Sequence, residues 1–249
     1  MRGYDERSYG DGFADVYDEW YADVTDVAST VARMVAVAGE GGTVLELGVG
    51  TGRLAVPMSA AGLVVTGIDS SAAMLDRLAA ADPSGAVTVA RGDMVDDLPS
   101  GPFHAALVAY NTIFNLLDEA TQQRCFGEVA RCLMPGGAFV VEAFVPGPET
   151  GRDESSDVSV RSMATDHVVL SVSTNRPAEQ RAEGQFVQFS ERDGVRLRPW
   201  SIRWATPRQL DVMADAAGLA LESRFADMAG TEFTDDSAQH VSVYRKQAT

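Results

Sequence analysis

The chain has 249 residues, of which 45% are hydrophobic and 22% charged, which is typical of a soluble globular protein. That length allows one α/β domain with an insertion or one domain plus a small one. Its net charge of −16 argues against a nucleic-acid partner, because basic residues dominate affinity for a phosphate backbone. No stretch approaches the roughly 18 consecutive apolar residues of a membrane helix, and the N-terminal residues 1–7 lack the apolar core of a signal peptide. We therefore expect a cytoplasmic protein with no membrane partner.

The first 145 residues predict a helical N-terminus followed by alternating strands and helices. Hydrophobic residues at helical spacing over 13–38 predict two helical segments that break at 23–25. Strands are predicted at 43–47, 63–68, 86–90, 103–110 and 138–144, and helices from about residue 53, from about 71 and over 118–133. This alternation predicts a doubly wound, mostly parallel sheet with helices on both faces.

The pattern changes after Phe144. Residues 145–156 are rich in Pro, Gly and charge and predict a loop, and strand-like runs follow at 167–173, 185–190 and 195–204. Because Asp193-Gly194 favours a hairpin turn, we expect an antiparallel β insertion after the fifth strand. A helix from Thr206 and strands near 220–224 and 240–245 then complete a sheet of seven strands.

The two cysteines and three histidines predict neither a disulfide nor a metal site. Cys125 and Cys132 lie seven residues apart in one predicted helix, which separates their Cα atoms by about 10 Å. That is too far for a disulfide, so both are expected to pack in the core. His104, His167 and His240 lie far apart and have no neighbouring cysteines.

A glycine-rich turn and an acid in the second half of the βαβ unit predict a cofactor that contains a nucleoside. The predicted strand 43–47 runs into Gly48-x-Gly50-x-Gly52, and glycines allow both a sharp turn and close approach of a ligand. Asp69 ends the next strand, where a doubly wound fold places the acceptor for ribose hydroxyls. Arg53 replaces the third glycine of the dinucleotide pattern, and Glu46 suits an ammonium group better than a phosphate.

The string 44–52 resembles motif I of the class I S-adenosylmethionine-dependent methyltransferases. Arg91-Gly92-Asp93-Met94 and Leu133-Met134-Pro135-Gly136-Gly137 resemble two further motifs of that family, and the match covers about residues 40–145. The N-terminal region is most similar to the small-molecule type, in particular to the sugar-amine N-methyltransferases of bacterial secondary metabolism. The resemblance implies a Rossmann-like methyltransferase sheet, S-adenosylmethionine as cofactor and transfer of a methyl group to N or O of a small molecule.

The resemblance also implies roles for individual cofactor-binding residues. Asp69 and Ser70 would bind the ribose, and Asp93 and Met94 would contact adenine, although Asp93 is also suited to cap its own turn. Met74 is either a second adenine contact or a core residue. The remaining residues expected around the cofactor are Glu46, Gly48 and Gly50 from motif I, Arg33 for the methionine carboxylate, and Tyr9 and Tyr17 as a lid; for the last three, a solvated or packed helix face is the alternative.

The end of the fourth strand is expected beside the methyl group. Tyr110 and Asn115 lie there, and Asn115 stands where some sugar-amine N-methyltransferases have a histidine. Asn can orient a substrate but cannot usefully accept a proton. Glu142, near the end of the fifth strand, is expected to bind an amine or act as a base, with a solvated acid as the alternative. In-line displacement needs alignment at about 3 Å and exclusion of water more than it needs acid–base chemistry.

These expectations divide the chain into four parts and leave two other functions open. The parts are a helical lid region at 1–40, a cofactor-binding core at 41–145, an antiparallel roof over the substrate at 146–204, and closing elements at 205–249. In the roof, Arg198 beside Trp200 would recognise a carboxylate, a phosphate or a flat ring, with a plain outer face as the alternative. The alternative functions are an NAD-dependent oxidoreductase and a non-catalytic S-adenosylmethionine-binding module. We expect a small-molecule substrate, no nucleic acid, and a monomer or homodimer.

Overall fold

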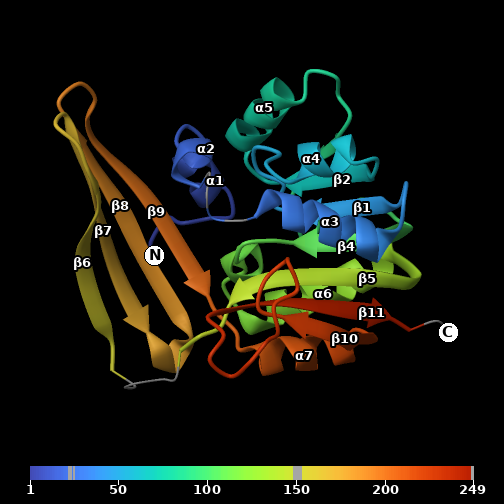
Figure 1. Ribbon diagram of the computed structural model, residues 1–249. Helices are drawn as coiled ribbons and strands as arrows, with labels where there is room; N and C mark the ends of the chain where they lie inside the picture. The colour runs from blue at the N-terminus through green and yellow to red at the C-terminus, as the bar shows by residue number, and fades with distance from the viewer. Residues whose placement is uncertain (22–23, 25, 148–152, 248–249) are drawn as a thin grey trace.

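The computed structural model describes residues 1–21, 24, 26–147 and 153–247. A seven-stranded sheet forms its centre, with the strand order β10-β11-β5-β4-β1-β2-β3 (Figure 1). The neighbours from β5 to β3 pair in parallel, and β11 is antiparallel to both β5 and β10. The strands are β1 (Thr43–Leu47), β2 (Val64–Asp69), β3 (Thr88–Arg91), β4 (Phe103–Val108), β5 (Leu133–Phe144), β10 (Leu219–Phe225) and β11 (Gln239–Lys246).

Helices cover both faces of this sheet, as the alternating pattern predicted. One hydrophobic cluster packs the first face beneath α3, α4 and α5, and the other packs the second face beneath α6 and α7. Both cysteines are free and buried, as expected of core residues. The bounds are α3 (Val27–Ala38), α4 (Ala55–Ala60), α5 (Ala72–Ala81), α6 (Glu119–Cys132) and α7 (Pro207–Ala216).

Side-chain caps explain where three of these helices begin. The side chains of Ser71, Asp118 and Thr206 accept hydrogen bonds from backbone N–H groups in the first turns of α5, α6 and α7. At α7 the cap is reciprocal, since the Gln209 side chain accepts from the Thr206 N–H at 2.8 Å. Such caps satisfy N–H groups that have no partner within the helix. The sequence predicted helix starts at or near all three positions.

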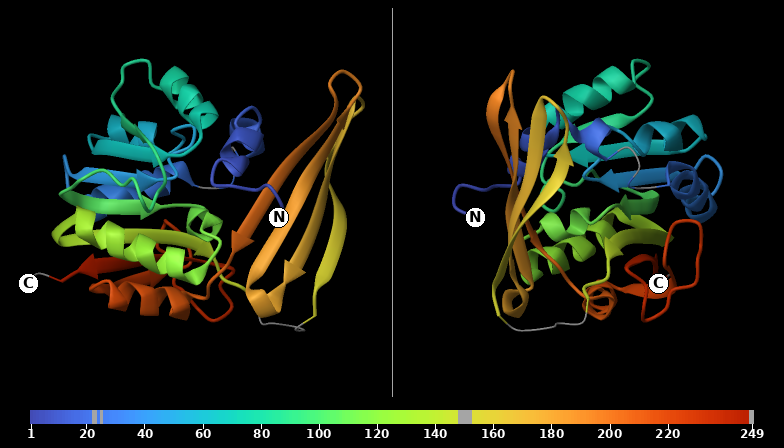
Figure 2. Two further views of the ribbon diagram at one scale, coloured as in Figure 1. Left: turned by 180° about the vertical axis from the view of Figure 1, so that it is seen from behind. Right: turned by 60° about the vertical axis from the view of Figure 1, so that its left-hand side comes forward.

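The N-terminal segment forms two short helices instead of the single helical segment predicted before residue 23. These are α1 (Ser8–Phe13) and α2 (Tyr17–Trp20), and α3 follows them. Of the predicted break at 23–25, only Val24 lies within the described residues. Figures 1 and 2 show α1 and α2 between the central sheet and a second sheet. Apolar side chains on these helices pack against both neighbours, which explains their helical spacing.

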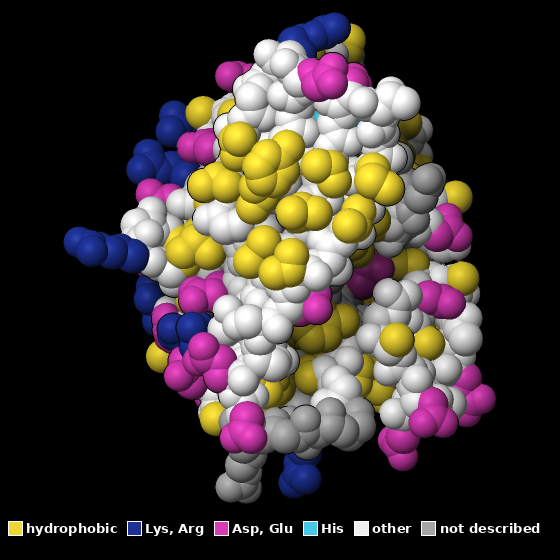
Figure 3. All heavy atoms as spheres, turned by 90° about the vertical axis from the view of Figure 1, so that its left-hand side faces the viewer, with side chains coloured by type: hydrophobic (Ala, Val, Ile, Leu, Met, Phe, Trp, Pro, Cys, Tyr) yellow, Lys and Arg dark blue, Asp and Glu magenta, His cyan; other side chains and the backbone are white. Residues whose placement is uncertain are grey.

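The second sheet has four antiparallel strands in the order β6-β7-β8-β9, one more than predicted. They are β6 (Ser155–Met163), β7 (His167–Arg176), β8 (Arg181–Ser190) and β9 (Gly194–Arg203), with the short helix η2 (Pro177–Glu179) between β7 and β8. The prediction missed β6 because it is an edge strand whose side chains are all exposed. One face of this sheet packs on α1 and α2, and Figure 3 shows the opposite face.

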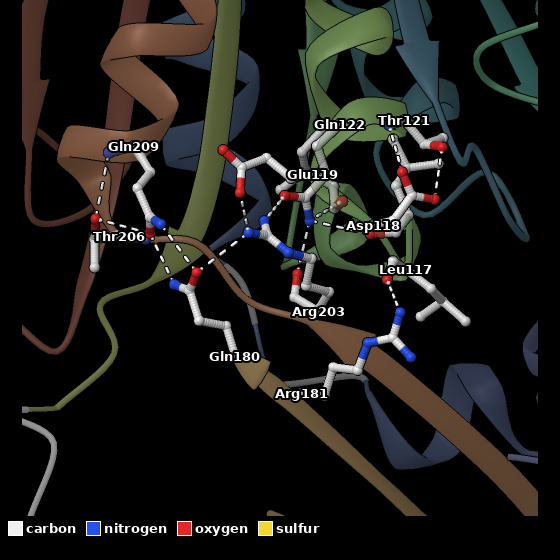
Figure 4. A network of polar contacts seen from close by, with 12 residues as sticks. Leu117, Asp118, Glu119, Thr121, Gln122, Gln180, Arg181, Arg203, Thr206 and Gln209 are labelled. Carbon is white, nitrogen blue, oxygen red and sulfur yellow. Dashed lines mark hydrogen bonds and ion pairs between the residues drawn. The ribbon is translucent and has the colours of Figure 1, made fainter. Parts of the chain in front are cut away.

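A polar network fixes the base of the second sheet to the core (Figure 4). The buried Arg203 donates to Gln122 Oε1 and to Glu119 Oε2 on α6, both at 2.6 Å. Gln180, beside η2, exchanges hydrogen bonds with Gln209 on α7 at 2.8 and 2.9 Å. These hydrogen bonds attach the second sheet to the central domain at its base.

Candidate active site

The glycine-rich turn after β1 has the open geometry that its sequence predicted. Gly48 and Gly50 have φ angles of 67° and 55°, in the left-handed region that favours glycine. The N–H groups of Gly48 and Val49 both donate to the Ile68 carbonyl, at 2.9 and 3.0 Å, and this binds the turn to β2. A Cβ atom on Gly50 would meet nothing nearer than the Gly48 oxygen at 3.9 Å, so the turn faces open space there.

Asp69 is fixed beside this turn at the end of β2. Its Oδ2 accepts from the Gly50 N–H and its Oδ1 from the Ser71 N–H, both at 2.9 Å. Burial raises the pKa of the Asp69 carboxyl, and the two N–H groups counteract that shift. Each oxygen accepts one backbone hydrogen bond and still has a lone pair that can accept from a ligand hydroxyl.

A cavity opens between this turn and the N-terminal segment. Ten of the residues predicted for the site line it: Tyr9, Tyr17, Gly48, Gly50, Asp69, Ser70, Met74, Asp93, Met94 and Asn115. Arg33, Glu46, Tyr110 and Glu142 are not among its lining residues. The residues that sequence reasoning missed are Tyr4, Asp5, Glu6, Gly10, Ile68, Gly92, Thr112 and Leu116.

Asp93 and Met74, both expected at adenine, line the cavity and also have the structural roles that the sequence left as alternatives. Asp93 lines the cavity, but its Oδ1 also accepts from the Val95 and Asp96 N–H groups at 2.8 and 3.0 Å and so caps its own turn. Met74 lines the cavity and is also a core residue, 2% exposed. A cavity wall made of core residues is held in place by the packing behind it.

The N-terminal helices are attached to the core directly over the cavity. The Thr51 hydroxyl donates to Asp18 in α2, and the Ser71 hydroxyl donates to Asp11 in α1, both at 2.6 Å. The Ser70 hydroxyl also donates to the Glu6 carbonyl at 3.0 Å. This arrangement places Tyr9 and Tyr17 where a lid would have to lie.

Two ionisable side chains, the buried Glu46 and the half-buried Arg53, lie behind the glycine turn. Burial raises the pKa of Glu46 to about 8, and the neighbouring Arg53 only partly offsets the effect. Within the described residues, Glu46 Oε2 and Arg53 Nε and Nη1 are buried without hydrogen-bond partners. Buried polar atoms of this kind are unusual unless a ligand or water satisfies them. The sequence indicated Arg53 only as a replaced glycine, and its unpartnered nitrogens make it a candidate binding group.

Glu142 supports an unusual turn at the end of β4. Tyr110 and Asn111 have φ angles of 44° and 66°, which few residues other than glycine adopt, and the predicted strand therefore ends at Val108. Glu142 Oε2 accepts from the Tyr110 N–H at 2.9 Å, and its carbonyl accepts from the Asn111 N–H at 3.1 Å. Glu142 is 7% exposed, so the alternative of a solvated acid is wrong. Burial raises its pKa.

Tyrosine rings connect this turn to the N-terminal helices. Tyr21 packs on Tyr17, with ring centroids 4.8 Å apart, and on Tyr110 at 5.9 Å. Burial raises the pKa of Tyr17 to about 12, so its hydroxyl is neutral near pH 7. Neutral aromatic rings attract cations through their faces. A sulfonium or a protonated amine would suit this surrounding.

Two arginines are placed differently from expectation. Arg33 lies outside the lining of the cavity: its Nε donates to the Met228 carbonyl at 3.3 Å, and its guanidinium stacks on the Phe225 ring at 4.1 Å. Arg198 is 1% exposed and pairs through both terminal nitrogens with Asp15, at 2.6 and 2.9 Å. It faces inward, so the alternative of an outer sheet face is wrong. Because Asp15 occupies its guanidinium, Arg198 links α1 and α2 to the second sheet instead of binding a ligand.

Comparison with known proteins identifies the family. Residues 44–137 match the methyltransferase-domain family. The CcbJ methyltransferase of Streptomyces caelestis is 38% identical, with a TM-score of 0.88 over 98% of this chain and 100% of that one. The cypemycin N-terminal methyltransferase of a Streptomyces species is 26% identical over 93% of this chain and 98% of its own. An uncharacterized methyltransferase of Anoxybacillus flavithermus is 35% identical over 140 residues, and this chain spans 61% of its length.

The chain belongs to the S-adenosylmethionine-dependent methyltransferases, as its motifs predicted. Its cofactor is therefore S-adenosylmethionine, and its fold is the family's seven-stranded sheet with an antiparallel insertion after β5. Family membership decides against the alternative of an NAD-dependent oxidoreductase. Among the helices of the described residues, none is long and apolar enough to cross a membrane.

Proposed function

We propose that this methyltransferase acts on the nitrogen of a small-molecule amine. The observation that carries the proposal is the position of Glu142, whose carboxylate accepts a hydrogen bond from the backbone of Tyr110. Thr112 and Asn115, on the 3₁₀ helix η1 (Thr112–Asn115), are polar side chains that line the cavity near this turn, and neither an aliphatic hydroxyl nor an amide usefully takes up a proton. An amine can bind already deprotonated, whereas an aliphatic hydroxyl needs a base that typically contributes about 10²–10⁴-fold in rate. The relationship to the cypemycin N-terminal methyltransferase supports nitrogen as the acceptor.

The cavity residues would hold the cofactor by complementary chemistry. Asp69, beside Gly50 and Ser70, would accept from the ribose hydroxyls, and Asp93, Met94 and Met74 would surround adenine. The unpaired atoms of Glu46 and Arg53 fit the two ends of an amino acid, with Glu46 for the ammonium and Arg53 for the carboxylate. Arg53 takes over the role that the sequence assigned to Arg33. The bound cofactor supplies an activated methyl group whose leaving group is a neutral thioether.

The remaining residues would align the acceptor and exclude water. Tyr9 and Tyr17 would close the cavity, and the ring faces of Tyr21 and Tyr110 would accommodate the positive charge of the methylated amine. Glu142 would fix the backbone of Tyr110 and add negative charge near the amine. Alignment of the reacting atoms is sufficient for a large rate enhancement when the methyl group is already activated.

An acceptor panel tests this proposal. The protein is incubated with radiolabelled S-adenosylmethionine and with matched pairs of small molecules that differ only in an amino or a hydroxyl group. We expect label to transfer to amines and not to their hydroxyl counterparts. Preferred transfer to hydroxyls would refute nitrogen specificity. Binding of S-adenosylhomocysteine with no transfer to any acceptor would instead favour the non-catalytic module. The cytoplasmic location expected from the sequence stays a prediction.

A further inference from the structure

The outer face of the second sheet, opposite the face that packs on α1 and α2, is a continuous apolar surface. The strand registers place alternate residues of all four strands on it, with Val160 opposite Leu170, Leu170 opposite Val187, and Val187 opposite Leu197. Figure 3 shows hydrophobic side chains gathered across this face. We call this surface the outer patch, and it consists of Val158, Val160, Met163, Val168, Leu170, Val172, Val187, Phe189, Val195 and Leu197.

The outer patch is too exposed for an isolated water-soluble surface. Met163 is 78% exposed, Val158 65% and Val195 63%. Val160 and Leu197, on the two edge strands, are 60% and 57% exposed. Single exposed hydrophobic residues are common, but a contiguous patch that extends over all four strands of a sheet marks an interaction surface.

We propose that the outer patch is the interface of a homodimer, in which it packs face to face on the same patch of a second copy of this chain. Two such sheets would form a β-sandwich related by a twofold axis, with about 10 Å between the sheets. Both faces of the insertion would then be covered, one by α1 and α2 and the other by the partner.

The distribution of charge favours a second copy over other occupants. The chain carries a net charge of −16, so two copies repel each other wherever they meet through charged surfaces. The outer patch contains no charged residue. At its base, the Arg176 guanidinium forms ion pairs with the carboxylates of Glu154 and Glu183, both at 2.8 Å. An anionic lipid surface would repel a chain of this charge.

The outer face of the second sheet approaches the size that a stable dimer needs. Its four strands are 9 or 10 residues long. At about 4.8 Å between strands and roughly 3.4 Å per residue, the face has about 650 Å² of flat area, of which the outer patch is the apolar part. Because side chains project from this flat area, the solvent-accessible area is larger and approaches the roughly 800 Å² per partner of a standard interface. The longest run outside the described residues is 148–152, and five residues are too few to cover this face.

Sedimentation equilibrium and light scattering on the full chain test the proposal. We expect a particle of twice the chain mass of 26.5 kDa at micromolar concentration. The variant Val160→Glu/Leu197→Glu should weaken dimerisation by at least about a hundredfold, because it buries unpaired charges in the interface. Val212→Glu is the matched control, since Val212 is 63% exposed on α7, and it should remain dimeric.

A complementation experiment separates loss of the interface from loss of the fold. Val160→Lys/Leu197→Lys should be monomeric alone, and an equimolar mixture with the glutamate variant should form heterodimers, because opposite charges then meet across the axis. Each variant should keep the far-ultraviolet circular dichroism and the S-adenosylhomocysteine affinity of the wild type. A wild-type chain that stays monomeric at 100 micromolar, or a folded glutamate variant that stays dimeric, would overturn the proposal.

Discussion

Glu46 should make cofactor binding depend on pH, and this dependence tests the assignment of the methionine end of the site. The carboxyl is 4% exposed, and burial raises its pKa from the ordinary 4.5 to about 8. Without ligand at pH 7, Glu46 is therefore mostly protonated. If its role is to accept from the ammonium group of the cofactor, it must lose that proton when the ligand binds.

The size of the effect follows from the ionised fraction. With a pKa of about 8, roughly a tenth of the carboxyl is ionised at pH 7 and roughly a hundredth at pH 6, and the apparent affinity falls by the same fraction. We expect the affinity for S-adenosylhomocysteine to rise about fiftyfold from pH 6 to pH 8 and to level off above that. Binding at pH 7 should release close to one proton.

Isothermal titration calorimetry in buffers of different ionisation enthalpy measures both quantities. Glu46→Gln should bind more weakly at pH 8, and its affinity should change little between pH 6 and pH 8. Glu40→Gln, at an exposed position before β1, is the matched control and should behave like the wild type. A pH-independent affinity for the wild type, with no proton released, would refute the assignment of Glu46 to the ammonium group.

The same carboxyl should affect stability in the opposite direction. The folded state keeps a proton that the unfolded chain loses above pH 4.5, so this contribution is complete below pH 4.5 and disappears as the pH rises through about 8. Thermal unfolding of the wild type without ligand, compared with Glu46→Gln, should show the difference. A relative stability that rises with pH over this window would contradict a raised pKa.

Four further changes test the remaining parts of the site. Asp69→Ala should weaken S-adenosylhomocysteine binding about a hundredfold, because two charge-assisted hydrogen bonds are lost, and calorimetric affinity within twofold of the wild type would disprove ribose binding. Gly50→Val should fold but not bind the cofactor, whereas Gly85→Val, which has the same backbone strain in a loop with open space around it, should bind normally. Glu142→Gln should reduce turnover by at most about tenfold, since a Gln oxygen can still accept the hydrogen bond from the Tyr110 N–H. A loss above a hundredfold, with substrate binding intact, would indicate that Glu142 is a base and that oxygen is methylated. Asp15→Asn should lower the free energy of unfolding by about 3 kcal/mol, because it leaves the buried Arg198 guanidinium without its anion. Arg198→Met should cost less, and equal losses for the two variants in denaturant titration would contradict this account.

Local rules were sufficient for the order of the elements in the central domain and for the glycine turn. Alternating hydrophobic periods place the strands, and side chains such as Thr206 and Asp118 mark helix starts because capping involves only neighbouring residues. The turn after β1 and Asp69 at the end of β2 were identifiable for the same reason, since one βαβ unit contains them both. The family and its cofactor follow from this stretch together with the motifs at 91–94 and 133–137.

The side chains whose partners come from distant segments could not be placed from the sequence. Arg198 pairs with Asp15, 183 positions away, and Arg33 contacts Met228, 195 positions away, so neither is free for the role that its position in the sequence suggested. The burial of Glu142 and the lack of partners for Arg53 likewise depend on which segments pack over them. Alternation along a strand separates its two faces, but only the tertiary structure shows which face is covered. That is why the inward position of Arg198 and the exposure of the outer patch were both decided by the fold.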